Sequence, residues 1–294
     1  RPLASTRNRL EILGAALLFS TGGAAIKATA LTSWQVASFR SGVAALTLLL
    51  FLPSARRGWS WRVLLVAGAY AGTMVFFVAA NKLTTSANAI FLQAAAPVYV
   101  LFASPFLLRE KIRGRDLAFV AVVALAAGLL FVGRPPAAAT APNPRLGNVF
   151  GALCGLSYAG TIIGLRWLGS RAGGGGSSLP TVVAGNAVAF LVCLPFALPA
   201  RFAPVDAAVV GYLGVFQIGA AYVMLTDGLR HVAALEASVL LLLEPALNPF
   251  WSWIVHGENP GAWALAGGAV ILGATLVKTI VDGRPAPEVE APVG

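Results

Sequence analysis

Two apolar stretches, one in each half of the chain, decide the fold: residues 87–97, ANAIFLQAAAP, and residues 235–245, LEASVLLLLEP. Both stretches end in a proline, and in both a glutamate follows thirteen residues after that proline. The matching residues are Pro97 and Glu110 in the first half, and Pro245 and Glu258 in the second. A weaker match of glycine, alanine and serine positions joins residues 14–23 to residues 151–160. The chain therefore contains two copies of one pattern.

The composition is that of a membrane protein. Of the 294 residues, 58% are hydrophobic and 11% are charged, whereas a typical soluble domain has about 25% charged residues. This excludes a disordered chain, a coiled coil and an ordinary soluble α/β enzyme. The net charge of +10 would suggest nucleic-acid binding in a soluble protein, but here the charges lie in short clusters between apolar runs. We expect the partner to be a lipid bilayer and not a nucleic acid.

Ten segments are long enough to cross a bilayer, whose hydrocarbon core needs about 20 apolar residues per helix. The fifth is the clearest, because no charged residue occurs from Leu117 to Gly133. The sequence therefore predicts an all-α integral membrane protein with ten transmembrane helices. The segments are 10–30, 33–53, 61–81, 86–108, 115–133, 147–169, 179–200, 207–227, 235–256 and 260–281.

Lysine and arginine predict the orientation, because cytoplasmic loops of membrane proteins carry an excess of both. With the amino terminus placed inside, fifteen of these residues lie on the inner side and five on the outer side, and Arg40 lies within a span. The five outer residues are Lys27, Lys82, Arg134, Arg145 and Arg201. We therefore expect both termini to be cytoplasmic.

The spans divide into two repeats of five, at residues 10–133 and 147–282, with a connecting loop at 134–146 and a cytoplasmic tail at 283–294. Because five is odd, the second copy enters the membrane from the opposite side. Many secondary transporters use such inverted-topology repeats to enclose a site at mid-depth, which rocking motions open to alternate sides. We expect a central cavity between the two repeats.

A family resemblance rests on both copies of the proline pattern. The residues that carry it are Phe77 through Pro97-Val98 and Glu110 in the first copy, and Glu244-Pro245 and Gly257-Glu258 in the second. The pattern resembles the drug/metabolite transporter superfamily, and most closely its ten-helix branch with two EamA-type domains. The resemblance implies a carrier in a bacterial-type inner membrane that exports amino acids or similar small metabolites. Within that branch it is most similar to exporters of aromatic and other neutral amino acids.

Charged side chains within the membrane are the first candidates for function, because each costs from about 3 to over 10 kcal/mol on different scales. Glu244 is the deepest acid, and the first copy has Ala96 at the equivalent position. Glu244 could bind a substrate ammonium or take up a proton, or it could pair with Arg40. Pro97 and Pro245 each lack a backbone donor, so we expect them to break their helices.

Neutral polar and aromatic residues at mid-span complete the candidate site. Aromatic walls with a few polar groups suit a neutral or aromatic amino acid, although ordinary helix packing is the alternative for each residue. The candidates are Gln93, Tyr99, Tyr158, Asn186, Tyr222 and Asn248, with Phe19, Phe76 and Phe77, whose spans line the cavity by family resemblance. Asp227 and Arg230, at the inner junction of spans eight and nine, form either a salt-bridge gate or a solvated loop.

Other functions stay open beside a secondary carrier that works by alternating access. A channel also fits an inverted repeat, and a drug or nucleotide-sugar carrier fits the same superfamily. A membrane-embedded lipid-modifying enzyme fits less well, because it needs clustered acids or histidines, and His231 and His256 are far apart. The sequence has no nucleotide-binding motif and no CxxC, so we expect no enzyme activity, no cofactor and no metal.

Overall fold

The computed structural model describes residues 6–107, 114–132, 138–171, 179–228, 231–232 and 234–282. Within these ranges every regular element is a helix, apart from one isolated β-bridge between Ala138 and Ala141. The first half contains α1 (Thr6–Ser20), α2 (Gly22–Lys27), α3 (Ser33–Phe51), η1 (Pro53–Arg56), α4 (Trp61–Leu83), α5 (Ser86–Ala94), α6 (Ala96–Leu107) and α7 (Gly114–Val132). The second half contains α8 (Pro144–Arg171), α9 (Leu179–Ala197), α10 (Pro204–Tyr212), the π-helix η2 (Leu213–Ala220), α11 (Ala221–Gly228), α12 (Ala234–Leu241), α13 (Leu243–His256) and α14 (Gly261–Asp282).

The predicted all-α fold of ten spans is confirmed. Eight helical stretches of the described chain are long and apolar enough to cross a membrane. The fourth and ninth spans are each divided into two shorter helices, α5 with α6 and α12 with α13, by one non-helical residue, Ala95 or Leu242. Each break lies two or three residues before Pro97 or Pro245, where the missing N–H removes a helix hydrogen bond. The two proline patterns therefore mark the same structural feature in both repeats.

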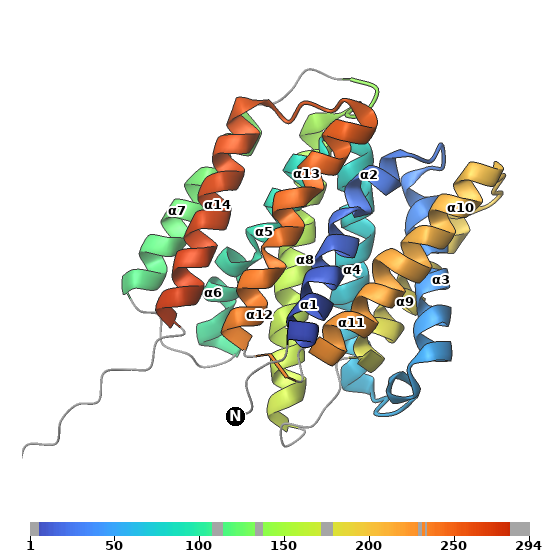
Figure 1. Ribbon diagram of the computed structural model, residues 1–294, viewed down its shortest axis with the longest axis horizontal. Coiled ribbons are helices and arrows are strands. Elements are labelled where there is room, and N and C mark those ends of the chain that lie inside the picture. The colour runs from blue at the N-terminus through green and yellow to red at the C-terminus, as the bar shows by residue number, and fades with distance from the viewer. Residues whose placement is uncertain are drawn as a thin grey trace, which may run out of the picture.

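Helix contacts show the inverted repeat directly. The second span packs on the seventh, as α3 on α9, and the fifth packs on the tenth, as α7 on α14. The contact between α4 and α8 has its counterpart between α11 and α1, with the roles of the two repeats exchanged. Figure 1 shows that α1 begins and α14 ends at the same end of the bundle, as an even number of spans requires. We call this the Arg7 end, and the opposite end the Lys27 end.

Close helix packing across the two repeats depends on a glycine face of α8. A methyl group added at Gly155 would stand 2.6 Å from the backbone oxygen of Leu92, and one at Gly151 would stand 2.8 Å from Leu92 Cδ1. Lipid provides no hydrophobic drive for helix association, so close backbone contact supplies the attraction instead. The α8 glycines thus hold α5 close to the centre of the bundle.

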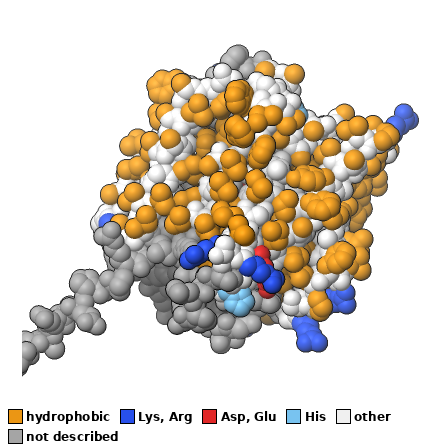
Figure 2. All heavy atoms as spheres, viewed as in Figure 1, with side chains coloured by type: hydrophobic (Ala, Val, Ile, Leu, Met, Phe, Trp, Pro, Cys, Tyr) orange, Lys and Arg blue, Asp and Glu red, His pale blue; other side chains and the backbone are white. Residues whose placement is uncertain are grey.

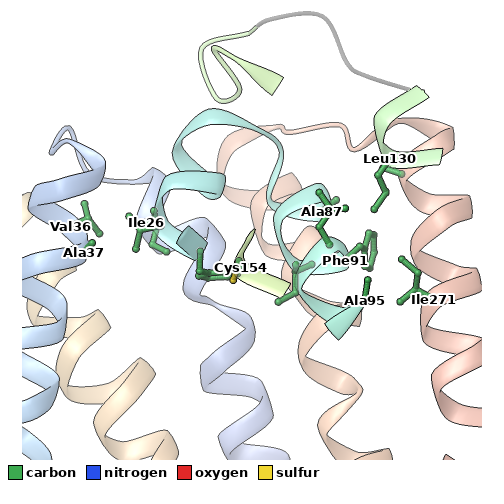
Figure 3. Packing of buried hydrophobic residues seen from close by; sticks show 14 of the residues in the cluster. Ile26, Val36, Ala37, Ala87, Phe91, Ala95, Leu130, Cys154 and Ile271 are labelled. Atoms are coloured by element: carbon green, nitrogen blue, oxygen red, sulfur yellow. The ribbon is translucent and has the colours of Figure 1, made fainter. Parts of the chain in front are cut away.

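The main apolar core joins helices from both repeats. Figure 3 shows its members spread across several helices, with Val36, Ala37 and Ile26 on the left and Phe91 of α5 between Ala87 and Ile271 on the right. The labelled residues are Ile26, Val36, Ala37, Ala87, Phe91, Ala95, Leu130, Cys154 and Ile271. Phe91 lies against α14 so closely that a methyl group on Gly268 would stand 2.2 Å from its ring. The first broken helix is therefore packed closely against α14.

The outer surface of the bundle is apolar over its middle. Figure 2 shows hydrophobic side chains covering most of the visible face, with blue Lys and Arg side chains mainly at its edges. Large apolar side chains remain exposed, among them Leu50 at 60%, Leu125 at 75% and Phe196 at 65%. Such a surface is stable in contact with lipid chains and not with water.

Candidate functional site

A cavity of about 340 Å³ lies in the middle of the bundle, between the two repeats. Both helix breaks border it: Ala94 and Ala96 lie beside the first, and Leu241 and Leu242 lie at the second. Discontinuous helices at corresponding positions of two repeats are the strongest sequence-level sign of a binding site in secondary transporters. The cavity extends toward the Arg7 end, because its lining includes Leu225, three residues before α11 ends at Gly228.

The two charged residues in the cavity lining are Arg40 of α3 and Glu244 of α13. Nη2 of Arg40 donates to the backbone oxygen of Met74 at 3.0 Å, while Nε has no hydrogen-bond partner. Among the described residues, Glu244 has no hydrogen-bond partner, and neither residue forms an ion pair. The alternative that Glu244 pairs with Arg40 is thus not what the structure shows. An acid and a base from different repeats face one cavity without neutralising each other.

Three hydrogen-bonded groups form a polar wall between the repeats. The hydroxyl of Tyr70 donates to the hydroxyl of Tyr222 at 3.3 Å, and Nδ2 of Asn186 donates to the Tyr70 hydroxyl at 3.3 Å. The ring of Tyr222 makes an edge contact with Phe19, with 5.2 Å between ring centroids. Tyr70 and Tyr222 line the cavity, whereas Asn186 lies behind them and fixes the orientation of Tyr70.

Most of the predicted site residues come together at this cavity. Those that line it are Phe19, Arg40, Phe77, Gln93, Pro97, Tyr158, Tyr222, Glu244 and Pro245. They come from eight different helices of both repeats, which explains why no single stretch of the sequence defines the site. Their roles in binding stay predictions.

The remaining predicted residues lie elsewhere. Phe76 stacks on Phe150, with 5.9 Å between ring centroids, because it is one residue away from the cavity-facing side of α4. Tyr99 lies beside Gly155 of α8. Asn248 is fully buried, and its Oδ1 would be 2.6 Å from a methyl group on Gly23. None of these residues is part of the cavity lining.

Of the predicted gate pair at the Arg7 end, only Asp227 lies among the described residues. Asp227 lies 3.9 Å from Nη2 of Arg7, and the two side chains are 44% and 80% exposed. Arg230 lies outside the described residues, as do Glu110, the start of the predicted linker at 134–137 and the predicted tail at 283–294.

Sequence reasoning missed three lining residues of α4. Tyr70, Thr73 and Met74 line the cavity together with Phe77. Their spacing of three, four and seven residues places them on one helix face. The mid-span position of Tyr70 is a signal that could have identified it from the sequence, because the same criterion gives Tyr99, Tyr158 and Tyr222.

The Lys27 end is closed by a buried ion pair. Nζ of Lys27 lies 2.8 Å from Oε2 of Glu258, and the two side chains are only 3% and 4% exposed. The ammonium also donates to the backbone oxygens of Thr84 and Thr140, and Oε1 of Glu258 accepts the backbone N–H of Ser86 at 2.6 Å. These bonds connect the end of α2, the α4–α5 turn, the segment before α8 and the end of α13.

Two more charged residues extend this closed end. Nζ of Lys82 donates to the backbone oxygen of Thr29 at 2.6 Å. Oδ1 of Asp206 accepts the hydroxyl of Thr29 at 2.5 Å and the N–H of Ala30 at 3.0 Å, while Oδ2 accepts the N–H of Ala203 at 3.1 Å. The first and second repeats are therefore joined across the Lys27 end by charge-assisted hydrogen bonds, which are the stronger kind.

The fold and the site define a multi-pass membrane protein built from two inverted five-span repeats around a central cavity. The profile of the EamA-like transporter family matches residues 10–132 and 145–279, so the chain belongs to that family. It is a family of transporters, which agrees with the predicted carrier and not with the enzyme alternative.

Solved structures share the fold as well. One crystal structure, whose title does not name its protein, has a TM-score of 0.60 and 19% sequence identity, and the match covers 93% of this chain and 96% of the other. At that identity the likeness concerns the fold alone. No curated protein matches the chain.

Proposed function

We propose that this protein is a secondary carrier that exports amino acids, with aromatic or neutral side chains favoured, by alternating access. The observation that carries the proposal is the carboxylate of Glu244, which borders the mid-membrane cavity without a partner among the described residues. An ionisable residue within a membrane is rarely retained without function, because it is costly there. A substrate ammonium is the natural partner for this carboxylate.

The size and the rest of the lining of the cavity suit an amino acid of moderate size. The volume of about 340 Å³ lies near the lower limit of ligand pockets, about 300 Å³. Phe19, Phe77 and Tyr222 supply aromatic faces, and Gln93 supplies an amide that can donate or accept. An apolar or aromatic side chain would bury its surface against these rings, while Glu244 would orient the ammonium.

Alternating access is supported by the difference between the two ends. The Lys27 end is closed by the Lys27–Glu258 pair, and the cavity lining reaches toward the Arg7 end. The distribution of Lys and Arg would place the Lys27 end outside and both termini in the cytoplasm of a cell with a bacterial-type inner membrane. The structure then corresponds to the inward-facing state, in which an exporter takes up its substrate.

Transport in proteoliposomes tests the proposal. Purified protein is reconstituted and offered a panel of radiolabelled amino acids, and we expect the fastest uptake for phenylalanine or another neutral amino acid. Preloading the vesicles with the same amino acid should accelerate uptake, since a carrier exchanges substrate and an open channel does not. No uptake of any amino acid would refute the proposed substrate class, and uptake without acceleration by preloading would indicate a channel.

The Glu244→Gln variant tests the role of the carboxylate. We expect it to reduce phenylalanine transport by about 10- to 100-fold, the usual effect of losing a hydrogen bond to a charged group. Measuring the wild type and this variant from pH 5 to pH 9, values chosen to span the range around neutrality, separates proton-coupled from downhill transport. An unchanged rate and pH profile would remove Glu244 from the mechanism.

A further inference from the structure

Arg40 is the second unneutralised charge in the cavity, and its surroundings are unusual for a membrane protein. Its residue is 1% exposed, yet no acidic group lies within ion-pair distance among the described residues. Its hydrogen bonds run from Nη2 to Met74, to the backbone oxygen at 3.0 Å and to Sδ at 3.8 Å. A guanidinium offers five N–H donors, so most of them are not used by the protein.

The free donors point to an anionic ligand. Nε of Arg40 is buried without a partner, and leaving such a charged donor unpaired is costly. The residue borders the same cavity as Glu244, the aromatic rings and the tyrosine hydroxyls. A planar guanidinium binds carboxylates through two parallel hydrogen bonds, which gives geometric specificity as well as energy.

We propose that Arg40 binds the carboxylate of the substrate, so that the cavity recognises zwitterions, with the ammonium at Glu244 and the carboxylate at Arg40. This assignment rests on the proposed function and names the substrate chemistry of the same site. Arg40 belongs to α3 of the first repeat and Glu244 to α13 of the second. A bound zwitterion neutralises one buried charge in each repeat and thereby links the two repeats through the ligand. An amine or an acid alone neutralises only one of them.

The test compares three ligands that differ only in their charged groups. Binding of phenylalanine, phenethylamine, which lacks the carboxylate, and 3-phenylpropionate, which lacks the ammonium, is measured by tryptophan fluorescence on the purified full chain. For the wild type we expect phenylalanine to bind at least about 10-fold tighter than either analogue. For Arg40→Gln we expect the affinity for phenylalanine to fall to that for phenethylamine, with the affinity for phenethylamine unchanged.

Two further variants separate ligand binding from folding. Arg40→Lys keeps the charge but not the planar fork, so it should retain part of the preference for phenylalanine over phenethylamine. This variant gives the answer if Arg40→Gln does not fold. Leu50→Ala is the matched control, because it changes a side chain of the same helix, α3, that is 60% exposed and is not part of the cavity lining. It should preserve the full preference.

The outcomes distinguish the two proposals. If the wild type binds phenethylamine as tightly as phenylalanine, or if Arg40→Gln weakens all three ligands equally, the role of Arg40 is overturned while an amine carrier still stands. If 3-phenylpropionate binds as tightly as phenylalanine, the zwitterion assignment is overturned. If the wild type binds none of the three ligands, both the Arg40 assignment and the proposed aromatic amino-acid substrate are overturned.

Discussion

The Lys27 end and the central cavity differ in whether their buried charges are paired. At the Lys27 end, Lys27 and Glu258 neutralise each other at 2.8 Å and form further hydrogen bonds with three backbone groups. In the cavity, Arg40 and Glu244 have no ion-pair partner among the residues that the structure describes. Since both pairs lie in a membrane protein of few charges, the difference indicates two purposes. The first pair joins the two repeats at the Lys27 end, and the second is available to the ligand that we propose.

Breaking the paired region should have the largest effect on stability. The change Glu258→Gln leaves the ammonium of Lys27 buried without its counter-charge, which typically costs about 3–5 kcal/mol. We expect a loss of that size in the free energy of unfolding, measured by denaturant titration in detergent micelles. The double variant Lys27→Met/Glu258→Gln should recover part of the loss, because it no longer buries an unpaired charge. A loss below about 1 kcal/mol would show that the pair does not hold this end closed.

Removing a charge from the cavity should change the free energy of unfolding in the opposite direction. Glu244→Gln deletes a carboxylate that has no partner among the described residues, and replacing poorly compensated buried charges is often neutral or stabilising. We expect the free energy of unfolding to stay the same or rise by about 1 kcal/mol in the same titration, even as transport falls. A clear loss of stability would reveal a structural role for Glu244 and weaken the contrast between the two regions.

Changes in the polar wall of Tyr70, Tyr222 and Asn186 should lower the free energy of unfolding by an intermediate amount. Tyr70→Phe removes the hydroxyl that donates to Tyr222 and accepts from Asn186. Such a change usually costs about 1 kcal/mol, and thermal unfolding should detect it. Tyr222→Phe serves as the comparison, because it leaves the bond between Asn186 and Tyr70 intact and should cost less. Equal losses in both variants would mean that Asn186 does not orient Tyr70.

A substitution at the Arg7 end should change the free energy of unfolding least. Arg7 pairs with Glu11 at 2.9 Å and lies 3.9 Å from Asp227, but its own side chain is 80% exposed. Exposed ion pairs contribute about 0–1 kcal/mol, so we expect Arg7→Gln to change the free energy of unfolding by less than about 0.5 kcal/mol. An effect as large as that of Glu258→Gln would show that both ends are closed by charge.

Much of the fold was predictable from local patterns. The low charge content and the apolar runs defined the spans, and the proline pattern located both helix breaks, at Ala95 and Leu242. The positions of Pro97 and Pro245 were informative because a missing N–H acts on the helix that contains it, whatever surrounds that helix. Glu244 was identified as the main candidate for a similar reason, since an acid at mid-span is costly in any membrane fold.

The geometry of the site was not predictable in the same way. Whether Phe76 or Phe77 faces the cavity depends on the rotation of α4, and its apolar sequence carries little periodic polarity to reveal that rotation. The Lys27–Glu258 pair joins residues that are far apart in the sequence, one from each repeat. Only the packing of α2, α5 and α13 against one another brings them together.

The ion pair at the Lys27 end also bears on the resting equilibrium of the ligand-free protein. Exchanging the conformations of two identical inverted repeats would convert one access state into the other, so the two states would have equal free energy. The repeats are not identical: when Gly23 is aligned with Gly160, Gly164 occupies the position of Lys27. The second copy therefore has no equivalent cation, so under the alternating access that we propose we expect the state closed at the Lys27 end to be favoured before any ligand binds. Differences in binding affinity between the two states must exceed this built-in preference for a substrate to reverse it.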